Sequence, residues 1–219
     1  MKKTITMILA LALCAALFAG CGKQPEPTTV PTTEATEAAE TTEAAETADP
    51  SAAALAILEK VWADYAEDEK FPVGGGNPET FVMDGPGAID LTKEHNLGNT
   101  LLLPEEVLAK VDGAATLMHM MNSNIFTGGL VHFGDDTDLT ALAAEMKDVI
   151  KNNPFVCGFP ESMVLAVVEG EYLLISFGNG EIMDIFRNHL TAVYPDTEIL
   201  YTEAISLADG ESMDTFQPA

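Results

Sequence analysis

The sequence predicts an α+β fold whose core is a ferredoxin-like, split βαβ sheet. Between residues 122 and 205, segments with strand and helix periodicity follow one another in the order β-α-β-β-α-β. Two of the strand segments are separated only by Glu169-Gly170-Glu171, which is typical of a tight hairpin. Both helical segments carry an apolar stripe at the spacing of an amphipathic helix. We therefore expect an antiparallel sheet with both helices packed on one face.

The first strand and the first helix of this core are predicted by adjacent segments. Residues 125–133 form a largely apolar run that we interpret as a strand. The polar stretch 135–138 then provides an N-cap for a helix that ends before the sequence PFVCGFPE. The predicted buried stripe of this helix consists of Leu139, Leu142, Ala143, Met146, Val149 and Ile150.

The remaining core elements follow this turn. The apolar runs 163–168 and 172–177 are the two strands of the hairpin. Asn179-Gly180 leads into the second helix, and residues 198–204 form the closing strand. The predicted buried stripe of the second helix consists of Ile182, Ile185, Phe186, Leu190 and Val193.

An additional helix and a long loop precede the core. Asp49-Pro50-Ser51 is a helix start, with Asp49 as the cap and proline in the first turn. Residues 71–100 form an irregular loop, and a short helix runs from about 103 to 110. The segment 114–123 is ambiguous between helix and strand. The first helix has an apolar face made by Leu55, Leu58, Val61, Trp62 and Tyr65.

The strands are apolar on both faces, which bears on what covers the sheet. A two-layer sheet should alternate between apolar and polar residues, yet GGLVHF, VLAVV and YLLIS are apolar at both parities. An exposed apolar face of this size is a liability for a monomer. We expect residues 50–121 to cover the second face, with a homodimer or a peptide partner as the alternatives.

The N-terminal segment predicts the location of the protein. Lys2 and Lys3 precede an apolar run over 5–19, and a small-residue site at 18–20 ends in Cys21. This pattern resembles a bacterial lipobox, so we expect residues 1–20 to be a lipoprotein signal peptide. Cys21 would then be lipidated with acyl chains such as palmitate, which would hold the mature chain on the extracytoplasmic face of the cell membrane. An ordinary secretory signal with a chance cysteine is the alternative.

A spacer and one domain are expected after the anchor. Residues 21–49 are rich in threonine, glutamate and alanine, and glutamates recur at every third position from 34 to 46 without a lysine to pair them. We interpret this stretch as a disordered, self-repelling spacer. Residues 50–219 form a single domain, with 50–121 as the N-terminal cover and 122–205 as the ferredoxin-like core.

The charge of the chain excludes some partners. The formal net charge is -25, and removal of residues 1–20, which contain two lysines and no acidic residue, makes it -27. Arg187 is the one arginine, so no basic stripe exists and we expect no nucleic acid partner. After signal removal and lipidation of Cys21, only Cys157 remains as a thiol, and we expect it to be buried and inert.

No sequence motif for catalysis is present. The glycines at 74–76 lack the Gly-Lys-Ser/Thr of a phosphate loop, and nothing matches a serine hydrolase or zinc protease motif. His119 and His132 with Asp135 or Asp136 would form a metal site only if they converged within about 5 Å. We expect neither a metal nor a cofactor, and we expect His189 to be partly buried and hydrogen-bonded.

A resemblance extends over residues 118–205. The motifs FTGGLVHF, NNPFVCGFPE and MVLAVVEGEYLLISFGNG follow one another in this region. In this order they resemble a domain of unknown function found in lipoproteins of Gram-positive anaerobes. Some similar proteins carry the label bacteriocin transport accessory protein, which implies a thioredoxin-like Cys-x-x-Cys. That motif is absent here, so the resemblance implies no redox chemistry and no catalytic residues.

These patterns favour a surface lipoprotein that acts as a non-enzymatic binding or accessory module for a peptide, protein or envelope component. A carboxylate- or metal-dependent hydrolase and a homodimeric structural module are the alternatives. The binding surface is expected at the loop 71–100 or at an open sheet face. The candidate binding residues are Trp62, Phe81, His119, Asn122, Phe126, His132 and Tyr172.

Overall fold

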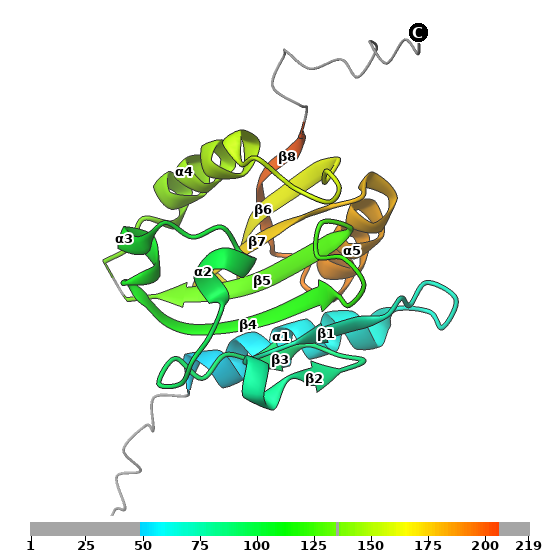
Figure 1. The fold of residues 1–219 in the computed structure, drawn as a ribbon, viewed down its shortest axis with the longest axis horizontal. Helices are drawn as coiled ribbons and strands as arrows, with labels where there is room; N and C mark the ends of the chain where they lie inside the picture. Colours follow the sequence, from blue (N-terminus) through cyan, green and yellow to red (C-terminus); the bar gives the residue numbers. More distant parts are fainter. Residues whose placement is uncertain (1–48, 135, 206–219) are drawn as a thin grey trace, which may run out of the picture. The chain divides into compact units, whose positions relative to one another are not determined.

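The computed structural model describes residues 49–134 and 136–205, and within them one large sheet is packed between helices (Figure 1). The expected signal peptide, the lipidation site at Cys21, nearly all of the spacer and Asp135 lie outside the described residues. The elements are α1 (Pro50–Asp64), β1 (Val73–Gly75), the 3-10 helix η1 (Pro78–Thr80), β2 (Val82–Met83), β3 (Gly87–Ala88), α2 (Leu97–Thr100), α3 (Glu105–Leu108), β4 (Val111–His119), β5 (Phe126–Phe133), α4 (Leu139–Asn152), β6 (Ser162–Val168), β7 (Tyr172–Gly178), α5 (Gly180–Val193) and β8 (Glu198–Ala204).

The predicted α+β class is confirmed. The sheet has eight strands, and all of its strand pairs are antiparallel. Its order is β2-β1-β4-β5-β7-β6-β8, with β3 paired to β4 at the side of β1. The segment 114–123, which was ambiguous from its composition, supplies most of β4.

The ferredoxin-like topology is not confirmed. In that topology the closing strand returns to lie beside the first strand of the core. Here β8 pairs with β6 at the opposite edge, and the side of β5 where the closing strand would lie is occupied by β4. The residues that precede the expected core are therefore part of the sheet itself, because β4 and β1 extend it beyond β5.

The helices α4 and α5 lie on opposite faces of the sheet, contrary to the expectation that they share one face. The strands β5 and β7 run antiparallel, yet the crossovers β5-α4-β6 and β7-α5-β8 advance in the same direction along the sheet. Crossovers between parallel strands are nearly always right-handed. Two right-handed crossovers that advance the same way from antiparallel strands must place their helices on opposite faces.

Two separate cores explain why the central strands are apolar at both parities. On one face, Met183 and Phe186 of α5 pack with α1 and with Val164 and Leu174 of the hairpin. On the other face, Met146 of α4 packs with buried residues of α2, α3 and the alternate strand positions, namely Leu97, Leu101, Val107, Met163, Leu165, Leu173 and Ile175. The chain therefore covers both faces of its own sheet.

The predicted helix caps are present. Asp49 accepts a hydrogen bond from the Ser51 amide at 3.0 Å and begins α1. Asp138 accepts from the amides of Thr140 and Ala141 at the start of α4, and Asn179 caps α5. These side chains satisfy amides that have no partner within the helix, which fixes where each helix begins.

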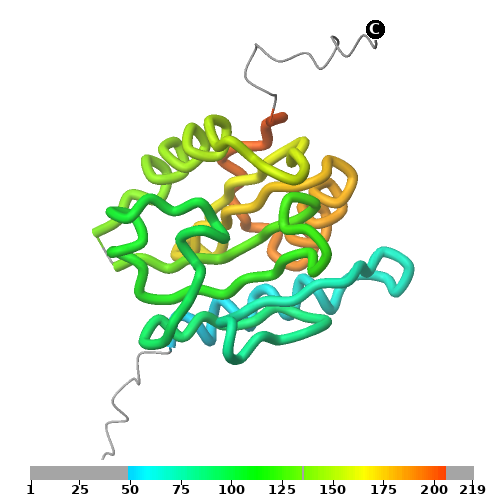
Figure 2. The backbone as a smooth tube through the Cα atoms, in the orientation of Figure 1, coloured from blue at the N-terminus to red at the C-terminus, as the bar shows by residue number. Residues whose placement is uncertain are grey.

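Residues 71–100 were expected to form an irregular loop, and most of them lie outside the sheet, but three short strands of the segment, β1, β2 and β3, extend it; Figure 2 shows the course of the chain here. The glycines at 74–76, which do not belong to a phosphate-loop motif, allow close backbone packing. A Cβ atom on Gly75 would lie 1.9 Å from the carbonyl oxygen of Thr116, and Gly76 has φ +94°. The Gly76 amide donates to the Thr116 hydroxyl at 3.0 Å. Only glycine fits such positions, so these residues are explained by backbone contact.

Candidate functional site

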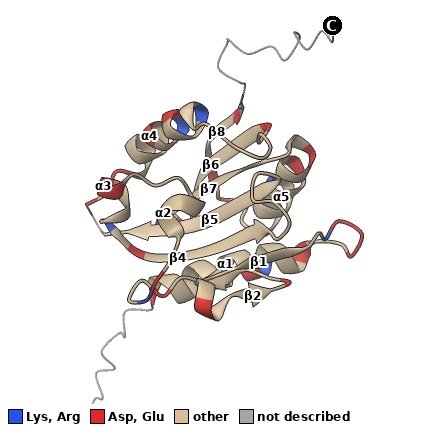
Figure 3. Ribbon diagram, viewed as in Figure 1, with Lys and Arg blue, Asp and Glu red and all other residues tan. Residues whose placement is uncertain are grey.

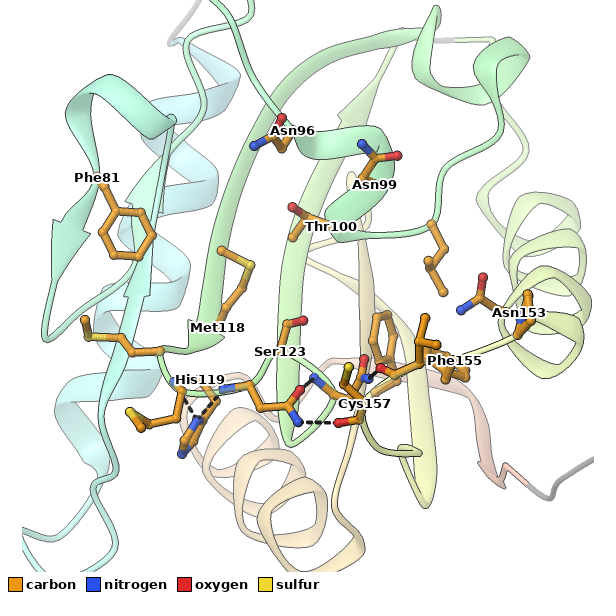
Figure 4. Close-up of a pocket in the computed structure, with 18 residues that line it drawn as sticks. Phe81, Asn96, Asn99, Thr100, Met118, His119, Ser123, Asn153, Phe155 and Cys157 are labelled. Atoms are coloured by element: carbon orange, nitrogen blue, oxygen red, sulfur yellow. Dashed lines mark hydrogen bonds between the residues drawn. The ribbon is translucent and has the colours of Figure 1, made fainter.

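A groove of about 910 Å³ opens on the sheet face that carries α2 and α4 (Figure 4). It is bordered by residues 96–102 around α2, by 118–124 at the turn between β4 and β5, and by 153–157 after α4. Phe81 lies at one end, and Phe155 and Phe177 form part of the interior, with their ring centroids 5.6 Å apart. A volume of this size is at the upper end of the range for ligand pockets.

The lining contains no aspartate, glutamate, lysine or arginine. Eighteen residues border the groove, and five of the nine asparagines of the chain are among them. The chain as a whole has 35 acidic and 10 basic residues, so an uncharged surface of this extent is unusual for it. Figure 3 shows α2 without a charged residue, whereas α3, α4 and α5 carry acidic ones. The groove is thus a neutral site on an acidic protein.

Four of the seven exposed large apolar side chains in the described part of the chain line this groove. Met121 and Val156 are the most exposed, at 82% and 78%, and both line it. Met120 and Phe81 also line it, while Val82, Met83 and Phe159 lie within a few residues of lining positions. Contiguous exposed apolar surface on a soluble domain usually marks an interaction site.

Two asparagines hold two borders of the groove together. Asn122 donates from its side-chain amide to the carbonyl of Cys157 at 2.8 Å. Asn124 donates to the carbonyls of Val156 and Gly158 at 2.8 and 3.0 Å. These bonds join the turn between β4 and β5 to the segment after α4, more than 30 residues further along the chain. The positions of Val156 and Cys157 therefore depend on the turn.

His119 stabilises the same turn. Its Nδ1 accepts hydrogen bonds from the amides of Met121 and Asn122 at 3.1 and 3.4 Å. Its ring stacks on Phe71 with centroids 5.7 Å apart. His119 thus supports the groove border through its ring and through Nδ1.

Three other asparagines leave their side-chain amides free. Asn96 and Asn99 lie at α2 and are exposed, and Asn153 lies on the border that follows α4 and is half-buried. None of these three side chains has a hydrogen-bond partner among the described residues, and Figure 4 shows them on two different borders of the groove. Each amide offers both donors and an acceptor to a ligand.

The structure brings together three of the seven expected binding residues. Phe81, His119 and Asn122 all border the groove. Trp62 and Phe126 belong to the core on the other face of the sheet. The Trp62 indole N–H donates to the carbonyl of Asp84 at 3.1 Å, so its polar group is already used within the protein.

His132 and Tyr172 lie at the far end of the sheet and do not contribute to the groove. They face each other across β5 and β7, with ring centroids 5.3 Å apart, and His132 is hydrogen-bonded to Asp112. His132 pairs with Gly113 of β4, whereas His119 ends that strand. Six residues of strand separate the two histidine levels, which is about 20 Å. The proposed convergence with Asp135 or Asp136 is therefore not found for the histidines, and Asp135 lies outside the described residues.

Two further expectations about reactive side chains have different outcomes. His189 is partly buried and hydrogen-bonded, as expected: its two ring nitrogens contact Asp64 at 2.8 Å and Glu69 at 3.1 Å, and its ring stacks on Tyr65. Cys157 was expected to be buried, but it is exposed at the border of the groove. The segment after α4 lies on the surface, where φ of +64° places Cys157 in a turn.

The sequence contains one feature of the groove that no known motif describes, namely paired asparagines. Asparagines occur in pairs in NLGN, NSN and NN, in three segments far apart in the chain. Short polar pairs of this kind are typical of turns, so they point to no binding site without a fold that brings them together.

No known protein family, no curated protein and no solved structure matches this chain. The resemblance to the domain of unknown function therefore stays a prediction. Within residues 49–134 and 136–205, no group of three or more histidine, cysteine or acidic side chains is arranged to hold a metal ion. None of the helices in the same residues is long and apolar enough to cross a membrane.

Proposed function

We propose that this chain is a lipid-anchored, extracytoplasmic lipoprotein whose folded domain is a non-enzymatic binding module for a peptide, protein or envelope component. The anchor is proposed from Cys21 and the apolar run 5–19 before it, which have the pattern of a lipobox. The acidic spacer 21–49 would hold the domain away from the membrane surface.

The single observation that carries the binding proposal is the neutral groove in an acidic protein. Its borders combine free amides at Asn96, Asn99 and Asn153 with exposed apolar groups at Met121 and Val156. Ligand sites are commonly apolar surfaces with a few polar groups that fix orientation. The groove has this composition, and the rest of its sheet face is covered by α2, α3 and α4.

The side chains of the groove favour binding over catalysis. Amide groups neither gain nor lose protons near neutral pH, so they recognise a ligand without acid or base chemistry. Among the residues that border the groove, His119 is the one imidazole, and its Nδ1 is occupied by two backbone amides. We therefore propose recognition through amides and apolar contact.

Site-specific photocrosslinking in the producing cell tests the proposal. A photoreactive amino acid at position 121 reports on the groove, and the same residue at the exposed position 52 of α1 is the control. We expect an adduct of one defined mass at 121 and none at 52. An adduct with twice the mass of the chain would support the homodimeric alternative, and the absence of any adduct at 121 would contradict the binding proposal. Intact mass of the purified chain separately tests acylation at Cys21.

A further inference from the structure

We infer that the groove takes an extended peptide segment with an uncharged, apolar centre and basic flanks. This inference rests on the proposed function and specifies its ligand. Four features support it: the free amides on two borders, the methionines of the surface, the exposed apolar residues at separate borders of the groove, and the distribution of charge.

The free amides match the chemistry of a peptide backbone. A side-chain amide carries the same donor and acceptor groups as a peptide bond, so it can pair with backbone N–H and C=O groups of a ligand irrespective of its side chains. Asn96 and Asn99 stand on the border around α2, and Asn153 stands on the segment after α4 (Figure 4). An extended strand directs backbone groups outwards along its length, and free amides on two different borders suit that arrangement.

Two of the four exposed large apolar residues that line the groove are methionines. Met118 lies within the groove, and Met120 and Met121 on the adjoining turn are 42% and 82% exposed. Methionine is unbranched and polarisable, so it adapts to apolar side chains of different shapes. Such surfaces are typical of sites that accept several related peptide sequences.

Exposed apolar residues are found at two separate borders of the groove. Phe81 lines it at one end, and the exposed Val82 and Met83 follow in sequence in β2, the edge strand. Val156 lines it on the segment after α4, and the exposed Phe159 follows three residues later. An extended chain can contact both borders, whereas a compact small molecule would contact only part of the groove.

The charge distribution of the protein further restricts which peptides can bind. A charged group at the centre of the segment would lose water in the groove without finding an opposite charge among the lining side chains. Outside the groove the protein is strongly acidic, with 35 acidic against 10 basic residues. Basic residues at the ends of the peptide would be attracted by this field, whereas acidic ends would be repelled.

Fluorescence polarisation tests the inference with the full lipidated chain in nanodiscs of uncharged phosphatidylcholine, which do not attract basic peptides. The probe is a fluorescein-labelled peptide with about five apolar residues between lysine pairs, a length that suits strand-like recognition. We compare it with a glutamate-flanked peptide, with a backbone N-methylated peptide of the same sequence, and with unlabelled diacetylchitobiose, a neutral sugar, as a competitor.

We expect the lysine-flanked peptide to bind, and N-methylation to weaken binding at least about tenfold by removing several backbone hydrogen bonds. Asn96→Ala and Asn99→Ala should each weaken binding of the lysine-flanked peptide about three- to tenfold. The matched control Asn188→Ala removes an exposed amide on α5, outside the groove, and should leave binding unchanged. The advantage of lysine over glutamate flanks should shrink in about 0.5 M salt.

The outcomes separate this inference from the proposed function. Equal binding of the N-methylated peptide, or equal loss in Asn188→Ala, would overturn backbone recognition by the groove amides. If the sugar binds in an Asn96-dependent way and no peptide does, the peptide inference fails while the groove remains a binding site. If neither binds and position 121 forms no crosslink, the inference and the proposed function fail together.

Discussion

The side-chain amide of Asn122 donates to the carbonyl of Cys157 at 2.8 Å and so joins two borders of the groove that are 35 residues apart in the chain. Asn124 reinforces the same connection through Val156 and Gly158. The exposed apolar groups of the groove are thus mounted on two loops that stabilise each other. This arrangement makes the shape of the site sensitive to changes that leave the sheet intact.

We expect Asn122→Ala combined with Asn124→Ala to loosen the segment 153–159. The three bonds to backbone carbonyls are lost, while the buried cores keep their contacts. Hydrogen exchange with mass spectrometry should show faster exchange in this segment and unchanged exchange in β6 and β7. Asn188→Ala, on the exposed side of α5, is the control. Unchanged exchange in 153–159 would show that the loop does not depend on these amides.

Gly75→Ala should destabilise the protein, whereas Gly85→Ala should not. A Cβ atom at position 75 would meet backbone atoms of Thr116 and Gly87 at 1.9 and 2.7 Å, and backbone cannot move aside as a flexible side chain can. At position 85 nothing lies within 4 Å of the added carbon. Urea unfolding should show a loss of about 1–3 kcal/mol or more for Gly75→Ala, as for overpacked sites. Equal stability of the two variants would contradict the close approach of β1 to its neighbours.

Ser51→Ala should cost about 1–3 kcal/mol of folding free energy, because it leaves buried polar groups unpaired. The Ser51 hydroxyl donates to the carbonyl of Ile89 at 2.8 Å and accepts from the amide of Ala114 at 3.1 Å. It therefore links α1 to the sheet from a buried position. Ser123→Ala is the matched control, since Ser123 is exposed. Urea unfolding that gave the same midpoint for both variants would rule out this role for Ser51.

Stability should fall as the pH rises above the ordinary range of tyrosine. Burial raises the pKa of Tyr65 and of Tyr172, with smaller contributions from Glu69 near Tyr65 and from Glu171 near Tyr172. Each group keeps its proton in the folded state at a pH where the unfolded chain has lost it. The folded state therefore binds more protons above about pH 10, and its stability decreases through that range.

Ultraviolet absorbance titration measures this effect. Tyr65 and Tyr172 should ionise late and together with unfolding, while Tyr65→Phe should remove one late transition. Thermal unfolding between about pH 9 and 11 should show a steeper loss of stability for the parent chain than for Tyr65→Phe. If all four tyrosines ionise in one step before unfolding, the raised pKa values are contradicted.

The sequence predicted most elements of the core because their signals are local. The caps at Asp49, Asp138 and Asn179 mark helix starts, and the hairpin at 169–171 has strong turn residues. The predicted order of strands was wrong because it depends on contacts far apart in the chain. β8 can pair only with a strand that has a free edge, and the edge of β5 is occupied by β4.

The candidate site was predicted only in part. Phe81, His119 and Asn122 come together because β1 pairs with β4, a contact between segments more than 40 residues apart. Trp62 and Phe126 were candidate binding residues, but large aromatic side chains gain most by burial, and both lie in the core. Asparagine pairs occur in three turns, but nothing in the sequence places these turns together, because their proximity follows from tertiary structure alone.

The placement of α4 and α5 on opposite faces gives this small protein two interiors that share the strands but no side chains. The floor of the groove belongs to the α4 interior. Substitutions that repack the α5 interior can therefore raise or lower the melting temperature while the ligand contacts stay as they are. For protein engineering, the α5 side is the place to add robustness, and the α4 side is the place to alter selectivity.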